Sequence, residues 1–119
     1  MSRLDTILLA DDDPDLREMI VANLVEAGYA VLTAADGYDA VRVLRENRVN
    51  LLITDVTMPG IDGFELARQA KVMRPSIHVI YLSGYSAAAG KTGGTAYGPI
   101  LQKPMRMDNL LDEISRQLK

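Results

Sequence analysis

Short apolar runs alternate along the whole chain with segments whose apolar residues recur at helical spacing. The runs end at turn residues and are too short for buried helices, which is typical of strands covered on both faces. Because a right-handed crossover places each helix against the sheet, this alternation predicts an α/β fold with a parallel sheet and helices on both faces. The five expected strands are residues 6–10, 29–34, 51–55, 77–82 and 100–102.

The expected helices between these strands carry start and stop signals. Asp13 before Pro14 predicts an N-cap followed by the first helical residue, and Gly28 is expected to end that helix. Asp36 and Gly37 predict a turn before the second helix. The apolar stripes of the four expected helices are Leu16, Ile20, Leu24 and Ala27; Ala40, Val41 and Leu44; Phe64, Ala67, Ala70 and Met73; and Met107, Leu110, Leu111, Ile114 and Leu118.

The segment 87–98 breaks the alternation. The three alanines at 87–89 favour a helix, but four glycines within 90–98 disfavour a regular one, so we expect the fourth helix to be short or irregular. Gly90-Lys91-Thr92 resembles the end of a nucleotide-binding P-loop. That motif requires glycine where Tyr85 stands, and we therefore disfavour a nucleotide site here.

Size and composition exclude several classes of function. We expect residues 1–119 to form a single domain, because this length suits one hydrophobic core. A net charge of −3 argues against direct binding of nucleic acid or of an anionic membrane, and the lack of cysteine excludes a thiol nucleophile and a zinc-thiolate site. The N-terminus lacks the apolar core of a signal peptide and no apolar run reaches membrane-spanning length, so we expect a cytoplasmic protein.

Chemically reactive side chains follow the expected strands at the points where they end. Asp11 and Asp12 follow the first strand, Asp55 ends the third, Ser83 follows the fourth and Lys103 follows the fifth. In a parallel sheet these positions share one edge, which is where ligands bind in open α/β folds. We therefore expect the three carboxylates, the hydroxyl and the ammonium to lie close together.

Three neighbouring carboxylates repel one another unless a cation lies among them. Mg²⁺ prefers oxygen ligands and commonly binds a few carboxylates together with a phosphate oxygen. Phosphoryl transfer requires such a site, because the transferring oxygens need positive charge and hydrogen-bond donors, which Mg²⁺, Lys103 and Ser83 would supply while Asp55 attacks. These residues predict a phosphoryl-acceptor site.

Four motifs in this order resemble those of a response-regulator receiver domain, and the resemblance covers the whole chain: ILLADDDP, LLITDVTMPGIDGFEL, YLSGY and LQKP. It implies a flavodoxin-like, doubly wound sheet with the strand order 2-1-3-4-5. It also implies that Asp55 is the phosphoacceptor and that Mg²⁺ is bound by Asp12, Asp55 and the main-chain carbonyl of Thr57, and by Asp11 largely through water. Ser83 corresponds to the switch hydroxyl and Lys103 to the lysine that pairs with the phosphoryl group.

The same resemblance implies a place in two-component phosphorelay signalling. The phosphate donor would be a histidine kinase or a histidine phosphotransfer protein, and the output would be binding to a downstream effector protein. We expect no enzymatic activity beyond self-catalysed phosphorylation and dephosphorylation. The chain is expected to act as a stand-alone receiver, or to be an excerpt of a larger chain such as a hybrid kinase.

Two features depart from the usual receiver pattern. Many receivers have an aromatic residue three positions before the lysine, where this chain has Ile100. The glycine-rich segment that follows Gly84-Tyr85 resembles a receiver subgroup with a remodelled fourth helix. We expect Tyr85 or Tyr97 to take over the signalling role of the missing ring.

Two other interpretations of the acidic residues remain open. Asp11 and Asp13 form an Asp-x-Asp pattern, which resembles the haloacid-dehalogenase-like phosphatases and would make Asp11 the nucleophile of a small Mg²⁺-dependent phosphatase. Asp55 would then not be required as the acceptor. Alternatively, the chain is a vestigial receiver that acts only as an interaction module. Asp13 is expected to cap a helix, and we assign no role to His78, the only histidine.

Overall fold

A computed structural model describes the chain at residues 5–84 and 97–119. Within these residues, five parallel strands form one sheet in the order β2-β1-β3-β4-β5. This is the flavodoxin-like order predicted from the sequence, and it is confirmed. The strands are β1 (Thr6–Ala10), β2 (Ala30–Ala34), β3 (Leu51–Asp55), β4 (His78–Ser83) and β5 (Ile100–Gln102).

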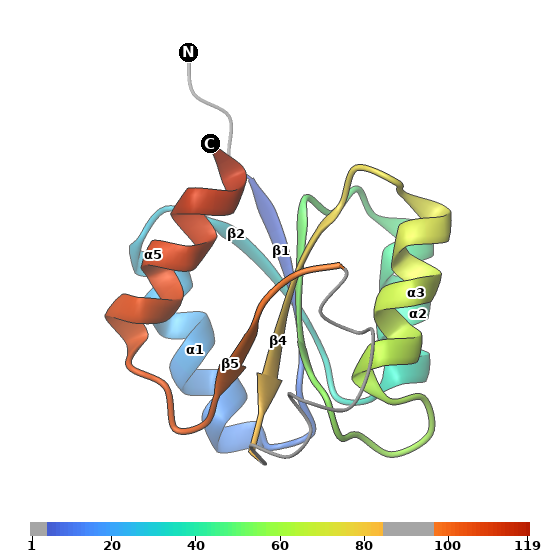
Figure 1. The fold of residues 1–119 in the computed structure, drawn as a ribbon, viewed down its shortest axis with the longest axis horizontal. Coiled ribbons are helices and arrows are strands. Elements are labelled where there is room, and N and C mark those ends of the chain that lie inside the picture. Colours follow the sequence, from blue (N-terminus) through green and yellow to red (C-terminus); the bar gives the residue numbers. More distant parts are fainter. Residues whose placement is uncertain (1–4, 85–96) are drawn as a thin grey trace.

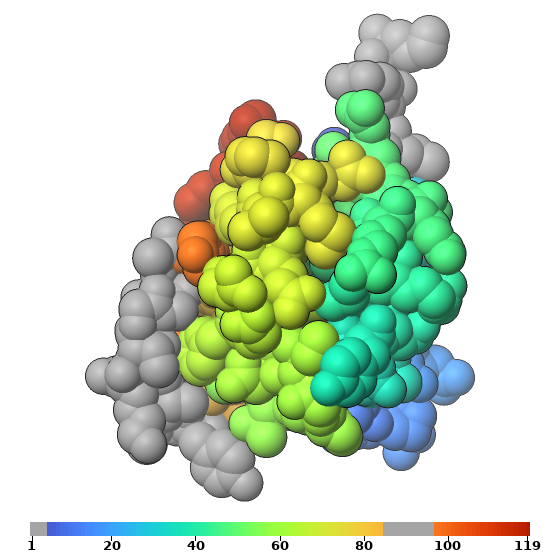
Figure 2. Space-filling model, turned by 90° about the vertical axis from the view of Figure 1, so that its right-hand side faces the viewer, coloured from blue at the N-terminus to red at the C-terminus, as the bar shows by residue number. Residues whose placement is uncertain are grey.

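The helices cover the sheet in two pairs (Figure 1). They are α1 (Pro14–Glu26), α2 (Gly37–Glu46), α3 (Gly63–Met73) and α5 (Met107–Leu118). Helices α1 and α5 lie on one face, whereas α2 and α3 lie side by side on the other, where they form the outer surface seen in Figure 2. The expectation of a short or irregular fourth helix concerns residues outside the described ranges. In the described part of the chain, no helix has the length and apolar character needed to span a bilayer.

Alternating residues of the strands form two separate cores. In β1, Ile7 and Leu9 pack toward α1 and α5, whereas Leu8 and Ala10 pack toward α2 and α3. Strand side chains alternate between faces, so a run that is apolar throughout needs a helical layer on each side. The central strand β3 is buried along its whole length, and this fixes Asp55 at its end.

Aspartates start three of the helices by accepting hydrogen bonds from first-turn amides. Asp13 accepts from the amides of Asp15 and Leu16 at 3.0 and 3.3 Å, so its predicted role as a cap is confirmed. Asp36 and Asp62 act in the same way for α2 and α3. The predicted turn at Asp36 is therefore the N-cap of a helix that begins at the next residue.

The end of α1 explains why β2 starts one residue later than predicted. The amide of Gly28 donates to the carbonyl of Val25, and the amide of Tyr29 donates to the carbonyl of Leu24. This is a Schellman arrangement, and Gly28 takes the left-handed conformation that it requires (φ 103°). Tyr29 therefore belongs to the helix cap, and the sheet pairing begins at Ala30.

Tyr81 is a buried aromatic residue on the α2/α3 side of β4. It is completely buried, lies in register with Ile100, and packs on Phe64 with ring centroids 5.2 Å apart. Its hydroxyl has no hydrogen-bond partner among the described residues, and burial together with the neighbouring Tyr97 raises the pKa of its phenol. A buried polar atom without a partner lowers stability, since it has lost its hydrogen bonds to water.

Replacing Tyr81 by phenylalanine is therefore expected to stabilise the protein. The ring contact with Phe64 is kept and the unpartnered hydroxyl is removed, so the free energy of unfolding should rise by about 1 kcal/mol. Urea denaturation followed by circular dichroism measures this change. Tyr38→Phe is the control, because Tyr38 is 65% exposed and its hydroxyl is solvated. A loss of stability in Tyr81→Phe would mean that the hydroxyl has a partner in solution.

Candidate functional site

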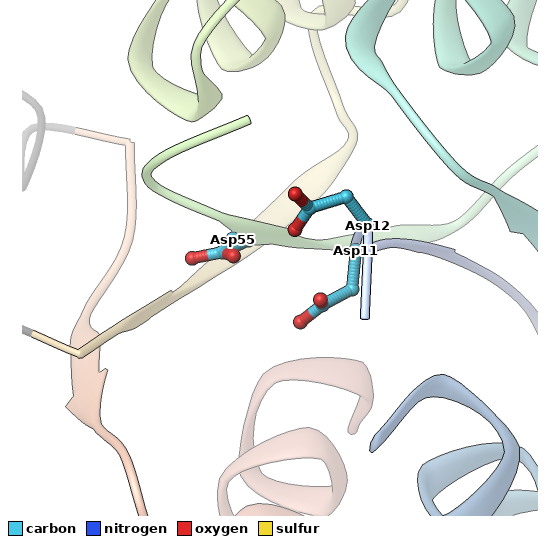
Figure 3. A group of neighbouring side chains, drawn as sticks. All are labelled: Asp11, Asp12 and Asp55. Atoms are coloured by element: carbon cyan, nitrogen blue, oxygen red, sulfur yellow. The ribbon is translucent and has the colours of Figure 1, made fainter. Parts of the chain in front are cut away.

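Three carboxylates meet at the edge where the strands end (Figure 3). Asp11 and Asp12 follow β1 and Asp55 ends β3, and one carboxylate oxygen from each lies within 4.8 Å of the others. Asp11 is fully buried, Asp55 is 8% exposed and Asp12 is exposed to solvent. The structure thus brings together the three acidic residues that the sequence placed at one edge.

Lys103 lies between two of these carboxylates. Its Nζ is 3.1 Å from Oδ2 of Asp11 and 3.2 Å from Oδ2 of Asp55. Burial lowers the pKa of Lys103, but hydrogen bonds and the charges of both aspartates outweigh burial, so the net shift is upward. The ammonium therefore stays charged, and in this structure it is a cation among the carboxylates.

Asp55 is a carboxylate under opposing influences. Burial raises its pKa, Lys103 lowers it and Asp11 raises it, with a net upward shift. The amide of Thr57 also donates to Oδ1 of Asp55, at 3.4 Å. Without Lys103, burial and the charge of Asp11 would favour the neutral carboxyl, which is a poor nucleophile.

The backbone around Asp11 is held by contacts that the sequence did not reveal. The amide of Asp13 donates to Oδ1 of Asp11 at 2.9 Å, and Nη1 of Arg17 donates to the carbonyl oxygen of Asp11 at 2.7 Å. The sequence signal for the second contact is Arg17 itself, a cation in the first turns of a helix that follows an acidic loop. These bonds orient Asp11 toward Lys103.

Ser83 and Thr57 complete the set of predicted site residues. Ser83 is the last residue of β4 and is 2% exposed, and its carbonyl accepts a hydrogen bond from the amide of Lys103 at 2.7 Å. Thr57 is exposed, two residues beyond Asp55. A backbone hydrogen bond therefore joins Ser83, which carries the hydroxyl, to Lys103, which carries the ammonium.

Gly63 allows the first turn of α3 to approach the backbone of Asp55. A Cβ atom at position 63 would lie 2.2 Å from the carbonyl oxygen of Asp55 and 2.9 Å from Cα of Val56. No side chain fits at that distance. The amide of Gly63 also donates to the carbonyl of Val56 at 2.8 Å, which fixes the loop between them.

The donor set fits Mg²⁺ better than a transition metal. All three candidate ligands are carboxylates, and the described residues near them contain neither a histidine nor a thiol. Carboxylate oxygens are hard donors, and Asp12 is exposed to solvent, so the group suits Mg²⁺, which keeps some of its bound waters. The acidic pocket therefore fits phosphoryl acceptance with Mg²⁺.

Comparison with known proteins agrees with this chemistry. The model of the response regulator receiver domain family matches residues 7–115. Over 114 residues the chain is 38% identical to the response regulator receiver protein CpdR of Brucella abortus (strain 2308), covering 94% of this chain and 95% of that protein. It is 33% identical over 115 residues to the transcriptional regulatory protein GlrR of Escherichia coli (strain K12), covering 95% of this chain but only 26% of that protein.

Solved structures give the same result for the fold. Response regulator protein TrrA from Thermotoga maritima, in complex with Mg²⁺-BeF, superposes with a TM-score of 0.88 at 28% identity, covering 96% of this chain and 99% of that one. With a family match that spans β1 to α5, this chain belongs to the family of response regulator receiver domains of two-component systems.

Proposed function

We propose that this receiver domain takes a phosphoryl group from a phosphohistidine onto Asp55, with Mg²⁺, and then signals by binding another protein. The observation that carries the proposal is the juxtaposition of Asp55 with Asp11, Asp12 and Lys103 at the strand ends. Asp55 is the member that ends the central, fully buried strand, while its side chain keeps access to solvent.

In the proposed reaction, an Oδ atom of Asp55 attacks phosphorus while the bond from phosphorus to the donor imidazole nitrogen breaks. The leaving imidazole keeps the bonding electron pair and takes up a proton. Asp11, Asp12, Asp55 and the carbonyl of Thr57 would hold Mg²⁺, which when bound neutralises charge on the phosphoryl oxygens. This chain's own contribution is to hold Asp55 at the end of a rigid strand.

Lys103 and Ser83 would then act on the phosphorylated state. Lys103 has its ammonium between Asp11 and Asp55, so it can pair with a phosphoryl oxygen after a small displacement. The Ser83 hydroxyl would donate to another phosphoryl oxygen. The amide of Lys103 donates to the carbonyl of Ser83, so the two residues are neighbours and both side chains would contact the same phosphoryl group.

The donor needs a surface beside Asp55, and a shallow hollow is available there. It has a volume of about 320 Å³ and is lined by Asp13, Leu16, Met19, Lys103, Pro104 and Met105. Met19 is 46% exposed, so this surface offers apolar contact area next to the site. We propose it as the docking surface for a histidine kinase or a histidine phosphotransfer protein.

The remaining parts of the proposal concern the setting of this reaction. Residues 1–119 would act as one receiver domain in the cytoplasm, with a downstream effector protein as partner and without direct binding to nucleic acid or membrane. Catalysis would be limited to phosphorylation and dephosphorylation of the domain itself.

Beryllofluoride trapping tests the acceptor. Addition of beryllofluoride with Mg²⁺ is expected to move the amide resonances of Asp55, Thr57 and Ser83, and EDTA should reverse the change. An adduct located on Asp11 would favour the phosphatase interpretation, and no response would favour a vestigial site. The same spectra test the role expected for Tyr97, whose resonances must move with the adduct, while Tyr85 lies outside the described residues.

A further inference from the structure

A second polar hollow lies at the opposite edge of the sheet from Asp55, where the strands begin. It has a volume of about 420 Å³ and is lined by the last residues of α3 and α5. Both helices end toward the top of Figure 1. Among the described residues, its lining includes polar donors and cations together with one acidic side chain. The polar and charged lining residues that matter here are Asp5, Arg48, Arg74, Ser76 and His78.

The charge of this corner is opposite to that of the whole chain. Arg48 and Arg74 line this hollow together with one acidic side chain, Asp5, and a hollow of about 280 Å³ shares Arg74 and adds Arg45. The chain as a whole carries a net charge of −3. A local excess of positive charge in an acidic protein favours binding of an anion.

Arg74 is the residue that most needs such a partner. One Nη of Arg74 donates to the carbonyl of Asn47 at 2.8 Å, but its Nε is buried without an acceptor among the described residues. No described carboxylate forms an ion pair with Arg74 or Arg48, whereas Arg42 is paired with Asp39 and Glu46. A partly buried guanidinium without a counter-charge is costly, and its planar set of N–H groups matches the oxygens of a phosphate.

We infer that this corner, defined by Arg48, Arg74, Ser76 and His78, binds the phosphate group of a small molecule. Two guanidinium groups supply the charge, and the Ser76 hydroxyl and the His78 ring supply further hydrogen-bonding groups. The volume exceeds that of a bare phosphate ion and lies in the range of small-molecule pockets. The site is independent of phosphorylation at Asp55, because it lies at the other end of the strands.

NMR titration of the full chain in EDTA tests this inference, since without Mg²⁺ the cation at the acceptor edge is Lys103, which is already paired with Asp11 and Asp55. Inorganic phosphate at constant ionic strength is expected to shift the Nε–Hε signal of Arg74 and the amides of Ser76 and His78, with saturation. Acetate should bind more weakly. A titration with adenosine monophosphate then shows whether the rest of the hollow contributes to binding. If its affinity equals that of inorganic phosphate, the site recognises the phosphate group alone. If its affinity is higher, the hollow also binds the nucleoside.

Two variants and a matched control make the result decisive. Arg74→Gln and Arg48→Gln should each weaken phosphate binding by about tenfold or more, the size of one charged hydrogen bond. Arg48 is exposed, so its replacement leaves folding intact. Arg42→Gln, which removes an arginine already paired with acids, should leave the affinity unchanged. Shifts that do not saturate, tighter binding of acetate, or unchanged affinity in both test variants would overturn the inference.

Discussion

Asp55→Asn is expected to abolish phosphotransfer to this chain. Asparagine has nearly the same shape as aspartate but lacks the anionic oxygen that attacks phosphorus. Radiolabelled phosphate from a panel of autophosphorylated histidine kinases and phosphotransfer proteins should label the wild-type chain and leave the variant at background. The donor that labels the wild type fastest would also be identified as a partner.

The fold should survive this substitution. Burial raises the pKa of Asp55, which means that the charged carboxylate is disfavoured in the folded state. A neutral amide at this position removes that cost, so the metal-free variant should be no less stable than the wild type. Asp62→Asn is the matched control, because it makes the same change in the following loop and asparagine caps a helix as well as aspartate does. Labelling of Asp55→Asn at the wild-type rate would show that another residue accepts the phosphoryl group, with Asp11 as the first candidate.

Lys103→Met should produce the second large effect, a loss of stability in the absence of metal. It leaves the buried carboxylates of Asp11 and Asp55 without their ammonium partner. Removing one member of a buried charge cluster costs about 3 kcal/mol. Urea denaturation at neutral pH in EDTA measures the loss. Lys71→Met is the control, since Lys71 donates to the carbonyl of Ile77, away from the site, and its loss should cost about 1 kcal/mol.

The pH dependence of this loss has a definite sign. The pKa of Asp55 is raised from its ordinary value of 3.8, and removing Lys103 should raise it further. A carboxyl group with a raised pKa in the folded state favours folding at pH below its ordinary value, and this contribution disappears as the pH rises through the raised pKa. The destabilisation by Lys103→Met should therefore be small at low pH and grow toward neutrality.

Magnesium should reverse most of this loss. Under the proposed function, Mg²⁺ at Asp11 and Asp55 would compete with Lys103 in the wild type, whereas in Lys103→Met it would supply the missing positive charge. Adding Mg²⁺ should therefore raise the unfolding midpoint of the variant by more than that of the wild type. An equal rise in both proteins would show that Lys103 and the metal do not share these carboxylates.

Most of the fold could be predicted because its signals are local and periodic. Buried runs such as residues 6–10 and 51–55 mark strands by composition alone, and Asp13-Pro14 marks a helix start through backbone chemistry. The strand order followed from resemblance to receivers. Differences arose at boundaries, as at Tyr29, where a helix cap and a strand compete for the same residue.

The contacts within the site could be predicted only in outline. Strand ends placed Asp11, Asp55 and Lys103 on one edge, but the pairing of Lys103 with Asp11 joins residues 92 positions apart. The sequence predicted that Lys103 lies at this edge, but not that its ammonium lies between the carboxylates of Asp11 and Asp55. The unpartnered hydroxyl of Tyr81 has no sequence signal, because it depends on the side chains packed around it.

Gly63 has a genetic consequence. Every glycine codon becomes an alanine codon by a single base change, so one mutation is enough to place alanine at position 63. The added methyl group would meet the backbone of Asp55 and Val56, and α3 would have to move away from the strand that carries Asp55. A survey of gene variants that inspects only the acidic residues and the lysine would record such an allele as intact.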